Sequence, residues 1–390
     1  MARFVVEIVD GLDISNLINQ YAGRGSQAYN PATLLALIVY GYATGVFSSR
    51  KLERASYDSV AFRFIAANSH PDHDTLATFR RRFLPEIRAL FVLVLEMARE
   101  MKLLQMGTVC LDGTKIHANA SRHSALSHGH IIKLQAHLKK EVDEEKIAAR
   151  AAERYKQEKA EFDEMMEGRA AKEKATGKKL SGKVPKEPEP GPRDTDQINL
   201  TDEESRIMPV AGGGFEQCYN AQAAVDAPTM LIMGTGVTQA PNDKEQLKPM
   251  VETLKALPES IGEVKVMAAD TGYFSEKNVT LCEENKIEAL IAMAREDHHP
   301  GWADRFTEPA PLPENATPMK KMAHKLKTIK GKATYALRKQ IVEPVFGIIK
   351  SVLGFRQFSL RGLKKVSGEW DLVCLAWNVK RMAVLRLNVA

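Results

Sequence analysis

Three acidic residues could support metal-dependent chemistry if the fold brings them together: Asp112, Asp270 and Glu343. Asp112 and Asp270 each end a short apolar run that is typical of a β-strand. Glu343 is the only acid between Met319 and Gly368, a segment rich in lysine and arginine. In an α/β sheet, acids at the carboxyl ends of strands lie at the crevice where ligands bind. Three convergent carboxylates would form an all-oxygen site for Mg²⁺ or Mn²⁺, and two such ions can drive an in-line phosphoryl displacement.

Each of these acids also has an ordinary structural interpretation. Asp112 and Gly113 could form a turn, Asp270 could cap a helix, and Glu343 could be paired or solvated.

Two other patterns do not indicate a metal or phosphate site. The four histidines between positions 117 and 130 lack zinc-site spacing, and the Gly-Lys pairs near position 180 lack the Ser or Thr of a phosphate loop. The metal hypothesis therefore depends on the three acids converging.

The elements that would position the acids alternate between strands and helices. Apolar and β-branched runs predict five strands, at 108–112, 218–226, 230–237, 265–270 and 289–293. Apolar residues at helical spacing predict three helices among them, at 244–257, 275–285 and 333–353. The second and third strands are separated only by a turn, which predicts an antiparallel hairpin. This order predicts an α/β fold with a mixed sheet.

Two further regions lie outside this alternation. The spacing of apolar residues between positions 31 and 102 predicts several short helices, one of which carries Arg80, Arg81 and Arg82. Such a helix suits contact with a DNA backbone, although arginine triplets also occur on ordinary surfaces. Residues 130–166 predict a long charged helix, and residues 168–196 are so rich in Lys, Glu, Pro and Gly that we expect them not to order themselves. Together these segments predict an inserted helical arm with a flexible return.

The charge distribution indicates a polyanionic partner. The net charge of the 390 residues is only +6, but sixteen Lys and Arg and three acids follow position 318. A basic face binds DNA or RNA by releasing counterions from phosphates, although a solvated basic surface is the alternative.

Composition excludes several classes of protein. An apolar fraction of 44% and a charged fraction of 27% are those of a globular chain with two or three folding units. The four cysteines lie far apart, which argues against a disulfide framework and favours a reducing compartment. Acids interrupt the first apolar stretch, and the uncharged run from Pro31 to Ser49 has too short an apolar centre to span a membrane. We expect a soluble, cytoplasmic protein.

Several ordered motifs resemble one family along nearly the whole chain. They are Tyr29-Asn30-Pro31, Tyr40-Gly41-Tyr42, Pro71-Asp72-His73-Asp74-Thr75, Phe79-Arg80-Arg81-Arg82-Phe83, Leu111-Asp112-Gly113-Thr114-Lys115, Tyr219-Asn220-Ala221-Gln222, Asn242-Asp243-Lys244, Ala269-Asp270-Thr271-Gly272-Tyr273-Phe274 and Val342-Glu343-Pro344-Val345-Phe346-Gly347. The sequence resembles the DDE transposases of bacterial insertion sequences. The resemblance implies a ribonuclease H-like mixed sheet flanked by helices, with Asp112, Asp270 and Glu343 as the metal-binding triad.

The same resemblance implies a division of the chain. An amino-terminal helical DNA-binding transposase domain would occupy residues 1–104, the catalytic domain residues 105–126 and 206–390, and an inserted arm with its linker residues 127–205. The chain begins close to the family's Leu-Asp pattern, at Leu12 and Asp13, so we expect that an upstream portion seen in relatives is missing.

In related transposases a tyrosine, an arginine and a lysine flank the glutamate. Lys350 keeps the family spacing, but Tyr335 and Arg338 each lie one residue too far from Glu343. On a straight helix Arg338 would lie about 140° away from the glutamate. Pro344 predicts a kink or a restart that could restore the phase. Otherwise Lys339 would take the role of the arginine.

The resemblance thus predicts a transposase that uses two Mg²⁺ or Mn²⁺ ions to cut and rejoin double-stranded DNA at the ends of its element. We expect a homodimer or larger assembly on DNA, associated with the nucleoid and not with a membrane. The residues expected to contact DNA are Arg80, Arg81, Arg82, Tyr335, Arg338, Lys339, Lys350, Arg361, Lys364 and Lys365. Two alternatives remain: a hydrolytic nuclease of the same fold, and a truncated copy that survives as a DNA-binding regulator. The arm would pack on a partner helix, lie across DNA or act as a solvated spacer.

Overall fold

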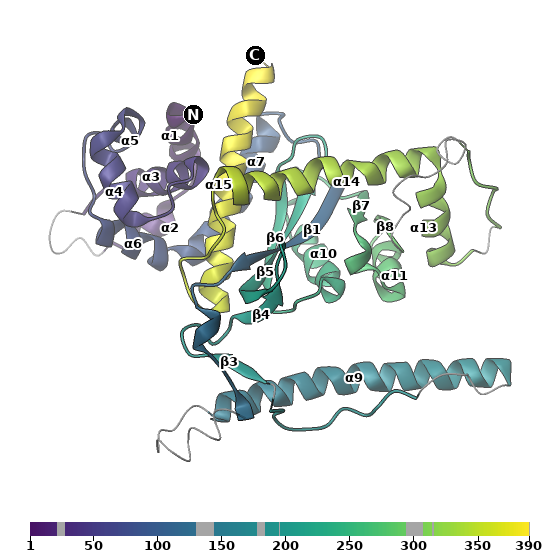
Figure 1. Ribbon diagram of the computed structural model, residues 1–390. Coiled ribbons are helices and arrows are strands. Elements are labelled where there is room, and N and C mark those ends of the chain that lie inside the picture. Colours follow the sequence, from purple (N-terminus) through teal and green to yellow (C-terminus); the bar gives the residue numbers. More distant parts are fainter. Residues whose placement is uncertain are drawn as a thin grey trace. The chain divides into compact units, whose positions relative to one another are not determined.

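The computed structural model describes residues 1–21, 28–129, 144–177, 184–194, 196–293, 307–313 and 316–389. The chain forms two compact units (Figure 1), one of residues 1–119 and 207–390 and one of residues 120–206. This division differs from the predicted one in two respects. The first 104 residues share a unit with the catalytic fold, and the insertion begins at Ala120 instead of at 127.

A mixed sheet forms the centre of the larger unit. Its strands are β1 (Thr108–His117), β4 (Arg206–Pro209), β5 (Phe215–Asp226), β6 (Ile232–Thr238), β7 (Val266–Ala269) and β8 (Glu288–Ile291). They follow the order β4-β5-β1-β7-β8, with β6 also paired to β5. β1 is antiparallel to β5 and parallel to β7, and β7 is parallel to β8. The predicted mixed sheet and the hairpin of β5 and β6 are confirmed.

β1 is longer than the sequence predicted. It continues past Asp112 to His117 because β5 pairs with it as far as Cys218, so Asp112 does not end its strand. β7, by contrast, ends opposite Leu111. The edge of β1 beyond Leu111 therefore extends past the end of its parallel neighbour.

Helices cover both faces of this sheet. They are α10 (Leu247–Lys255), α11 (Glu276–Glu284), α13 (Pro318–Lys327), α14 (Ile329–Gly347) and α15 (Leu363–Val389). On β6, Gly234 faces the α10 side chains Met250 and Leu254, whereas the next residue, Thr235, bonds to Asp371 of α15. Since successive residues of a strand face opposite sides, α10 and α15 lie on opposite faces.

The long helix α15 is a core element. From Gly368 to Val379 every residue is buried. The indole of Trp370 donates to the Gln222 carbonyl at 2.9 Å, and the Asn378 amide bonds to both the N–H and the carbonyl of Ile232 at 2.8 Å. These polar contacts fix α15 to β5 and β6 while its apolar surface fills the core.

Seven short helices precede the sheet and join the same core. They are α1 (Ala2–Gly11), α2 (Ser15–Ile18), α3 (Pro31–Thr44), α4 (Ser49–Asp58), α5 (Val60–Ile65), α6 (His73–Arg82) and α7 (Leu84–Glu100). Asn30 caps α3 with Pro31 in the first turn, as predicted, and Asp72 caps α6. Both α3 and α7 pack against α15, which is why these helices do not form a separate unit.

No single helix in the described ranges is long and apolar enough to cross a membrane. The pair α3 and α4 has the required length and composition only when taken together, and it is bent by 98°.

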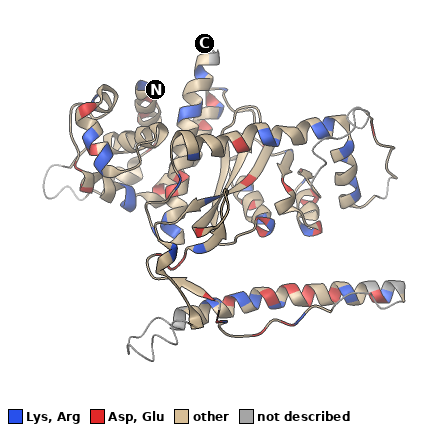
Figure 2. Cartoon of the chain, viewed as in Figure 1, with Lys and Arg blue, Asp and Glu red and all other residues tan. Residues whose placement is uncertain are grey.

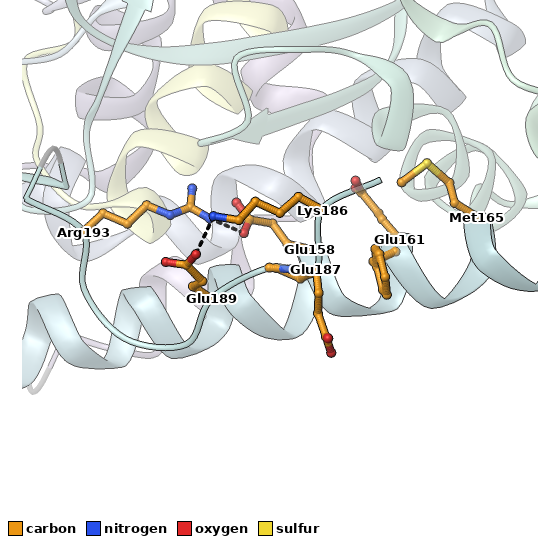
Figure 3. Close-up of a pocket in the computed structure, with 9 residues that line it drawn as sticks. Glu158, Glu161, Met165, Lys186, Glu187, Glu189 and Arg193 are labelled. Atoms are coloured by element: carbon orange, nitrogen blue, oxygen red, sulfur yellow. Dashed lines mark hydrogen bonds and ion pairs between the residues drawn. The ribbon is translucent and has the colours of Figure 1, made fainter. Parts of the chain in front are cut away.

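The smaller unit contains a two-stranded sheet and a long helix. β2 (Ala125–Ser127) pairs with β3 (Gln197–Asn199), and α9 spans Glu144–Thr176. The first fourteen residues of the predicted long helix lie outside the described residues. The return segment 184–194 follows α9 through ion pairs, Arg193 with Glu158 and Lys159 with Glu187, around a shallow hollow of about 420 Å³ (Figure 3). For this segment the expectation that it would not order itself is wrong, because opposite charges on the helix and on the returning chain neutralise one another.

Candidate active site

Asp112 lies on β1, and Asp270 directly follows the last residue of the parallel neighbour β7. The register of β1 and β7 pairs Cys110 with Ala268 and Leu111 with Ala269, so the next residue on each chain is an aspartate. The Asp112 side chain is only 17% exposed. Burial raises the pKa of Asp112 to about 7; Arg338 opposes this shift, and the negative charges of Asp270 and Asp243 add to it. The pair is thus an electrostatically unfavourable arrangement that a cation would relieve.

Glu343 reaches the same site through Arg338. The guanidinium of Arg338 is 3.2 Å from Asp112 Oδ2 through Nη1 and 3.2 Å from Glu343 Oε1 through Nη2. Arg338 is 11% exposed and Glu343 is 49% exposed. α14 runs uninterrupted through Pro344, so the helix does not restart there as expected. The side chain of Arg338 brings its guanidinium to both acids although Arg338 lies five residues before Glu343.

The alternative residue, Lys339, is exposed on α14 and has no contact with the acids among the described residues. Tyr335 is buried one turn before Arg338 on the same helix. Of the two cations left open by the sequence, the structure therefore brings Arg338 and not Lys339 to Asp112 and Glu343.

Lys350 lies beside β1 just beyond Asp112. It belongs to a π-helical turn, η5 (Ile348–Val352), that follows α14 directly. Its Nζ donates to Thr114 Oγ1 at 3.0 Å and to the Lys115 carbonyl at 3.3 Å. Burial lowers the pKa of Lys350, the usual effect of removing an ammonium group from water.

A third aspartate near the pair was not singled out from the sequence. Asp243 lies in the turn after β6, and its Oδ1 accepts hydrogen bonds from Asn220 at 2.6 Å and Gln222 at 2.7 Å. Its signal was the motif Asn242-Asp243-Lys244, which marked the resemblance without suggesting a role. The rule that selected Asp112 and Asp270, an acid ending a strand, does not apply to a residue in a turn.

Two family models match parts of the chain. The family described as Transposase domain (DUF772) matches residues 1–82, and the family described as Transposase DDE domain matches residues 190–379. The chain belongs to the DDE transposases. No curated protein and no solved structure matches it significantly. The second match contains Asp270, Glu343, Arg338 and Lys350, whereas Asp112 lies between the two matched regions.

The transposase fold is ribonuclease H-like, as the resemblance implied. Membership of the family also implies the use of a divalent metal and a DNA partner.

The donor chemistry of the site fits a hard cation, but the full set of ligands is not drawn together. Among the described residues, no three His, Cys, Asp or Glu side chains converge as ligands. Asp112 and Asp270 would share an ion through carboxylate oxygens, the ligands that Mg²⁺ and Mn²⁺ prefer. Glu343 is separated from this pair by the guanidinium of Arg338, which supplies the positive charge between the carboxylates.

Arg80 does not lie where DNA could contact it. Its side chain is buried, and Nη1 donates to Tyr42 Oη at 2.8 Å and to the Phe47 carbonyl at 3.0 Å. Tyr42 in turn donates to the buried carboxylate of Glu369 on α15 at 3.3 Å. The prediction of DNA contact by Arg80 is therefore corrected: its charge balances Glu369 inside the protein. Arg81 and Arg82 are exposed.

The basic carboxyl-terminal segment is not a free tail. Two of its three acids are buried, Glu369 with the backbone N–H groups of Ser359 and Leu360 at 3.0 and 2.9 Å, and Asp371 with Arg88 at 2.9 Å. Its exposed cations include Arg361, Lys364 and Lys365, located where α15 begins. Arg361 Nε donates to the Asn119 carbonyl at 3.0 Å.

Proposed function

We propose that this transposase cuts and rejoins DNA at the ends of its own insertion sequence with the help of two Mg²⁺ or Mn²⁺ ions. The observation that carries the proposal is the position of Asp112 and Asp270 directly after the paired residues Leu111 and Ala269, with Glu343 tied to Asp112 by one guanidinium. Asp112 and Asp270 would hold one ion between them, and Glu343 would complete the second site. When bound, such ions activate the attacking oxygen and stabilise the leaving oxygen of an in-line displacement.

Arg338 and Lys350 would position the scissile phosphate. Both are partly buried cations beside the acids, and each can donate hydrogen bonds to phosphate oxygens. The guanidinium of Arg338 is engaged by Asp112 and Glu343. Once those carboxylates have other partners, it becomes available to the DNA. Positioning and electrostatics supply most of the catalysis in phosphoryl transfer, so no covalent protein intermediate is needed.

Exposed cations would hold the duplex. Arg361, Lys364 and Lys365 lie at the start of α15, where positive charge is unfavourable for the helix dipole and a phosphate is favourable. Three cations at this end of the helix do not stabilise it, whereas they would bind the phosphates of a DNA backbone. Arg81, Arg82 and Lys339 are the other exposed residues of the predicted set. We also infer assembly as a homodimer or larger complex, since joining an element requires both of its ends.

The decisive experiment replaces Asp270 by asparagine, which keeps the shape of the side chain and removes its charge. Asp270→Asn should abolish strand cleavage while leaving binding to element ends close to the parental level. Glu276→Gln, an exposed acid on the following helix, is the matched control and should cut normally. Parental cleavage by Asp270→Asn would refute the triad.

A second assay separates the transposase from a hydrolytic nuclease. The parental protein is incubated with Mg²⁺, pre-nicked element ends and a target plasmid. Joined products support the proposal, whereas cleavage without any joining favours the nuclease.

A further inference from the structure

Asp243 is held in place by two buried amides. Asn220 and Gln222 lie two residues apart on β5 and so face the same side of the sheet. Their side chains are buried, with residue exposures of 0% and 2%, and both donate to Oδ1 of Asp243. Gln222 is itself fixed by the hydroxyl of Tyr273, which donates to its Oε1. These contacts leave Oδ2 as the oxygen of Asp243 that is not used by the amides.

The second oxygen of Asp243, Oδ2, lies near Asp270. A Cβ atom added to Gly272 would lie 3.0 Å from Asp270 Oδ1 and 3.6 Å from Asp243 Oδ2, so both carboxylates border the same small space. A Cβ atom on Gly113 would lie 2.6 Å from Asp243 Oδ1. Only glycine at 113 therefore lets Asp243 approach β1, next to Asp112. Because Asp112 and Gly113 are consecutive, Asp243 approaches from the opposite face of the sheet.

A buried oxygen in the same place has no partner. Oδ1 of Asn220 is buried and accepts no hydrogen bond from any residue in the described ranges. It lies 3.0 Å from the position of a Cβ on Gly113. The orientation of this amide is fixed because its Nδ2 donates to Asp243 and to the Ala240 carbonyl at 3.2 Å. Buried polar atoms of this kind are rare and call for a bound water or ion.

The two amides do not require a charge on Asp243. A neutral asparagine would offer the same accepting oxygen to Asn220 and Gln222. The negative charge adds repulsion to Asp112, which a bound cation would offset, and it also attracts the half-buried ammonium group of Lys115 on β1.

We propose that Asp243 is a fourth carboxylate of the metal site, positioned by Asn220 and Gln222 and reaching Asp270 across Gly113. It would bind an ion through Oδ2, either directly or through a bound water. Such a water would also donate a hydrogen bond to Oδ1 of Asn220. This inference rests on the proposed function, because it adds a ligand to the site that Asp112 and Asp270 are proposed to form.

The test measures Mn²⁺ binding to the full chain without DNA, by calorimetry and by the electron paramagnetic resonance of bound Mn²⁺. Asp243→Asn should weaken binding by about tenfold or more, the usual effect of removing a residue that supports a metal site. Its circular dichroism spectrum without added metal should match that of the parent, since an asparagine oxygen can still accept from Asn220 and Gln222. Glu245→Gln, an exposed acid two residues away, is the matched control for net charge and should bind Mn²⁺ normally.

Parental Mn²⁺ binding by Asp243→Asn, in a protein that keeps the parental circular dichroism spectrum, would overturn this inference. Asp112→Asn separates the two proposals. If Asp112→Asn loses Mn²⁺ while Asp243→Asn retains it, only the fourth carboxylate is wrong. If both variants retain it, the proposed metal site itself fails.

Discussion

The two longest helices of the protein, α9 and α15, differ in how much of their surface is buried. α9 has 33 residues, of which only Ile147 and Ala151 are buried apolar residues in the described part. α15 has 27 residues and is buried continuously from Gly368 to Val379. Figure 2 shows acidic and basic residues spread along the part of α9 that is not drawn in grey. Its unit, residues 120–206, contains eighteen Lys and Arg and eighteen Asp and Glu.

The difference shows two ways of making a long helix. α15 is stabilised by tertiary packing, with a few hydrogen bonds fixing it to the sheet. α9 is stabilised along its own surface, by pairs such as Arg154 with Glu158 and Lys159 with Asp163, and by the return segment. A neutral, internally paired surface offers little net attraction to DNA, so these charges favour contact with protein or a spacer role over contact with phosphates.

The largest contrast should appear when an apolar side chain is removed from each helix. Trp370 is fully buried on α15, whereas Met165 on α9 is 54% exposed. Trp370→Ala should lower the free energy of unfolding by about 3–5 kcal/mol, and Met165→Ala by less than about 0.5 kcal/mol. Urea denaturation followed by circular dichroism measures both. Equal decreases would mean that α9 is packed as tightly as α15 against something in solution.

The next contrast concerns the cations of the two units and their response to salt. Replacing Arg361, Lys364 and Lys365 by glutamine should flatten the slope of log affinity for DNA against log salt, by up to about 0.9 for each phosphate that is no longer neutralised. Binding to element ends and to unrelated DNA should weaken by similar factors, because phosphate contacts do not depend on sequence.

The matched control replaces three exposed cations of the smaller unit, Lys156, Lys174 and Lys186, by glutamine. This variant should keep the parental slope. A flattened slope in the control, or loss of only specific binding in the first variant, would reverse the assignment of DNA contacts between the two units.

The smallest effect on the larger unit should follow removal of the arm. Ser127 pairs with Gln197 and His128 bonds to the Asp196 carbonyl at 2.8 Å, so a short linker can replace residues 127–196. The catalytic unit should remain soluble, with a melting temperature within a few degrees of the parent. Assembly on paired element ends, measured by gel shift or light scattering, should weaken. Full transposition by the shortened protein would show that the arm has no role in assembly.

These contrasts also show what the sequence could reveal. The strands that lead to Asp112 and Asp270 were predictable because a short run of apolar and β-branched residues is a local property of the sequence. The arm helix was predictable from its charge pattern, but the order of residues 184–194 was not, since it depends on ion pairs with residues some thirty positions away.

Three features of the site depended on tertiary structure in the same way. The burial of Arg80 could not be inferred, because a triplet of arginines gives no sign that one of them meets Tyr42. The choice of Arg338 over Lys339 required the actual path of α14. Asp243 required knowing that Gly113 leaves room for a carboxylate from the other face of the sheet.

The buried contact between Tyr42 and Glu369 has a consequence for how the gene can be expressed. Translation restarted at an internal methionine such as Met97 would yield a chain without Tyr42 and Arg80, and without the helices that cover α15. Such a product would expose the apolar face of α15 and leave Glu369 without its balancing arginine. We expect it to be degraded instead of accumulating as a free catalytic fragment.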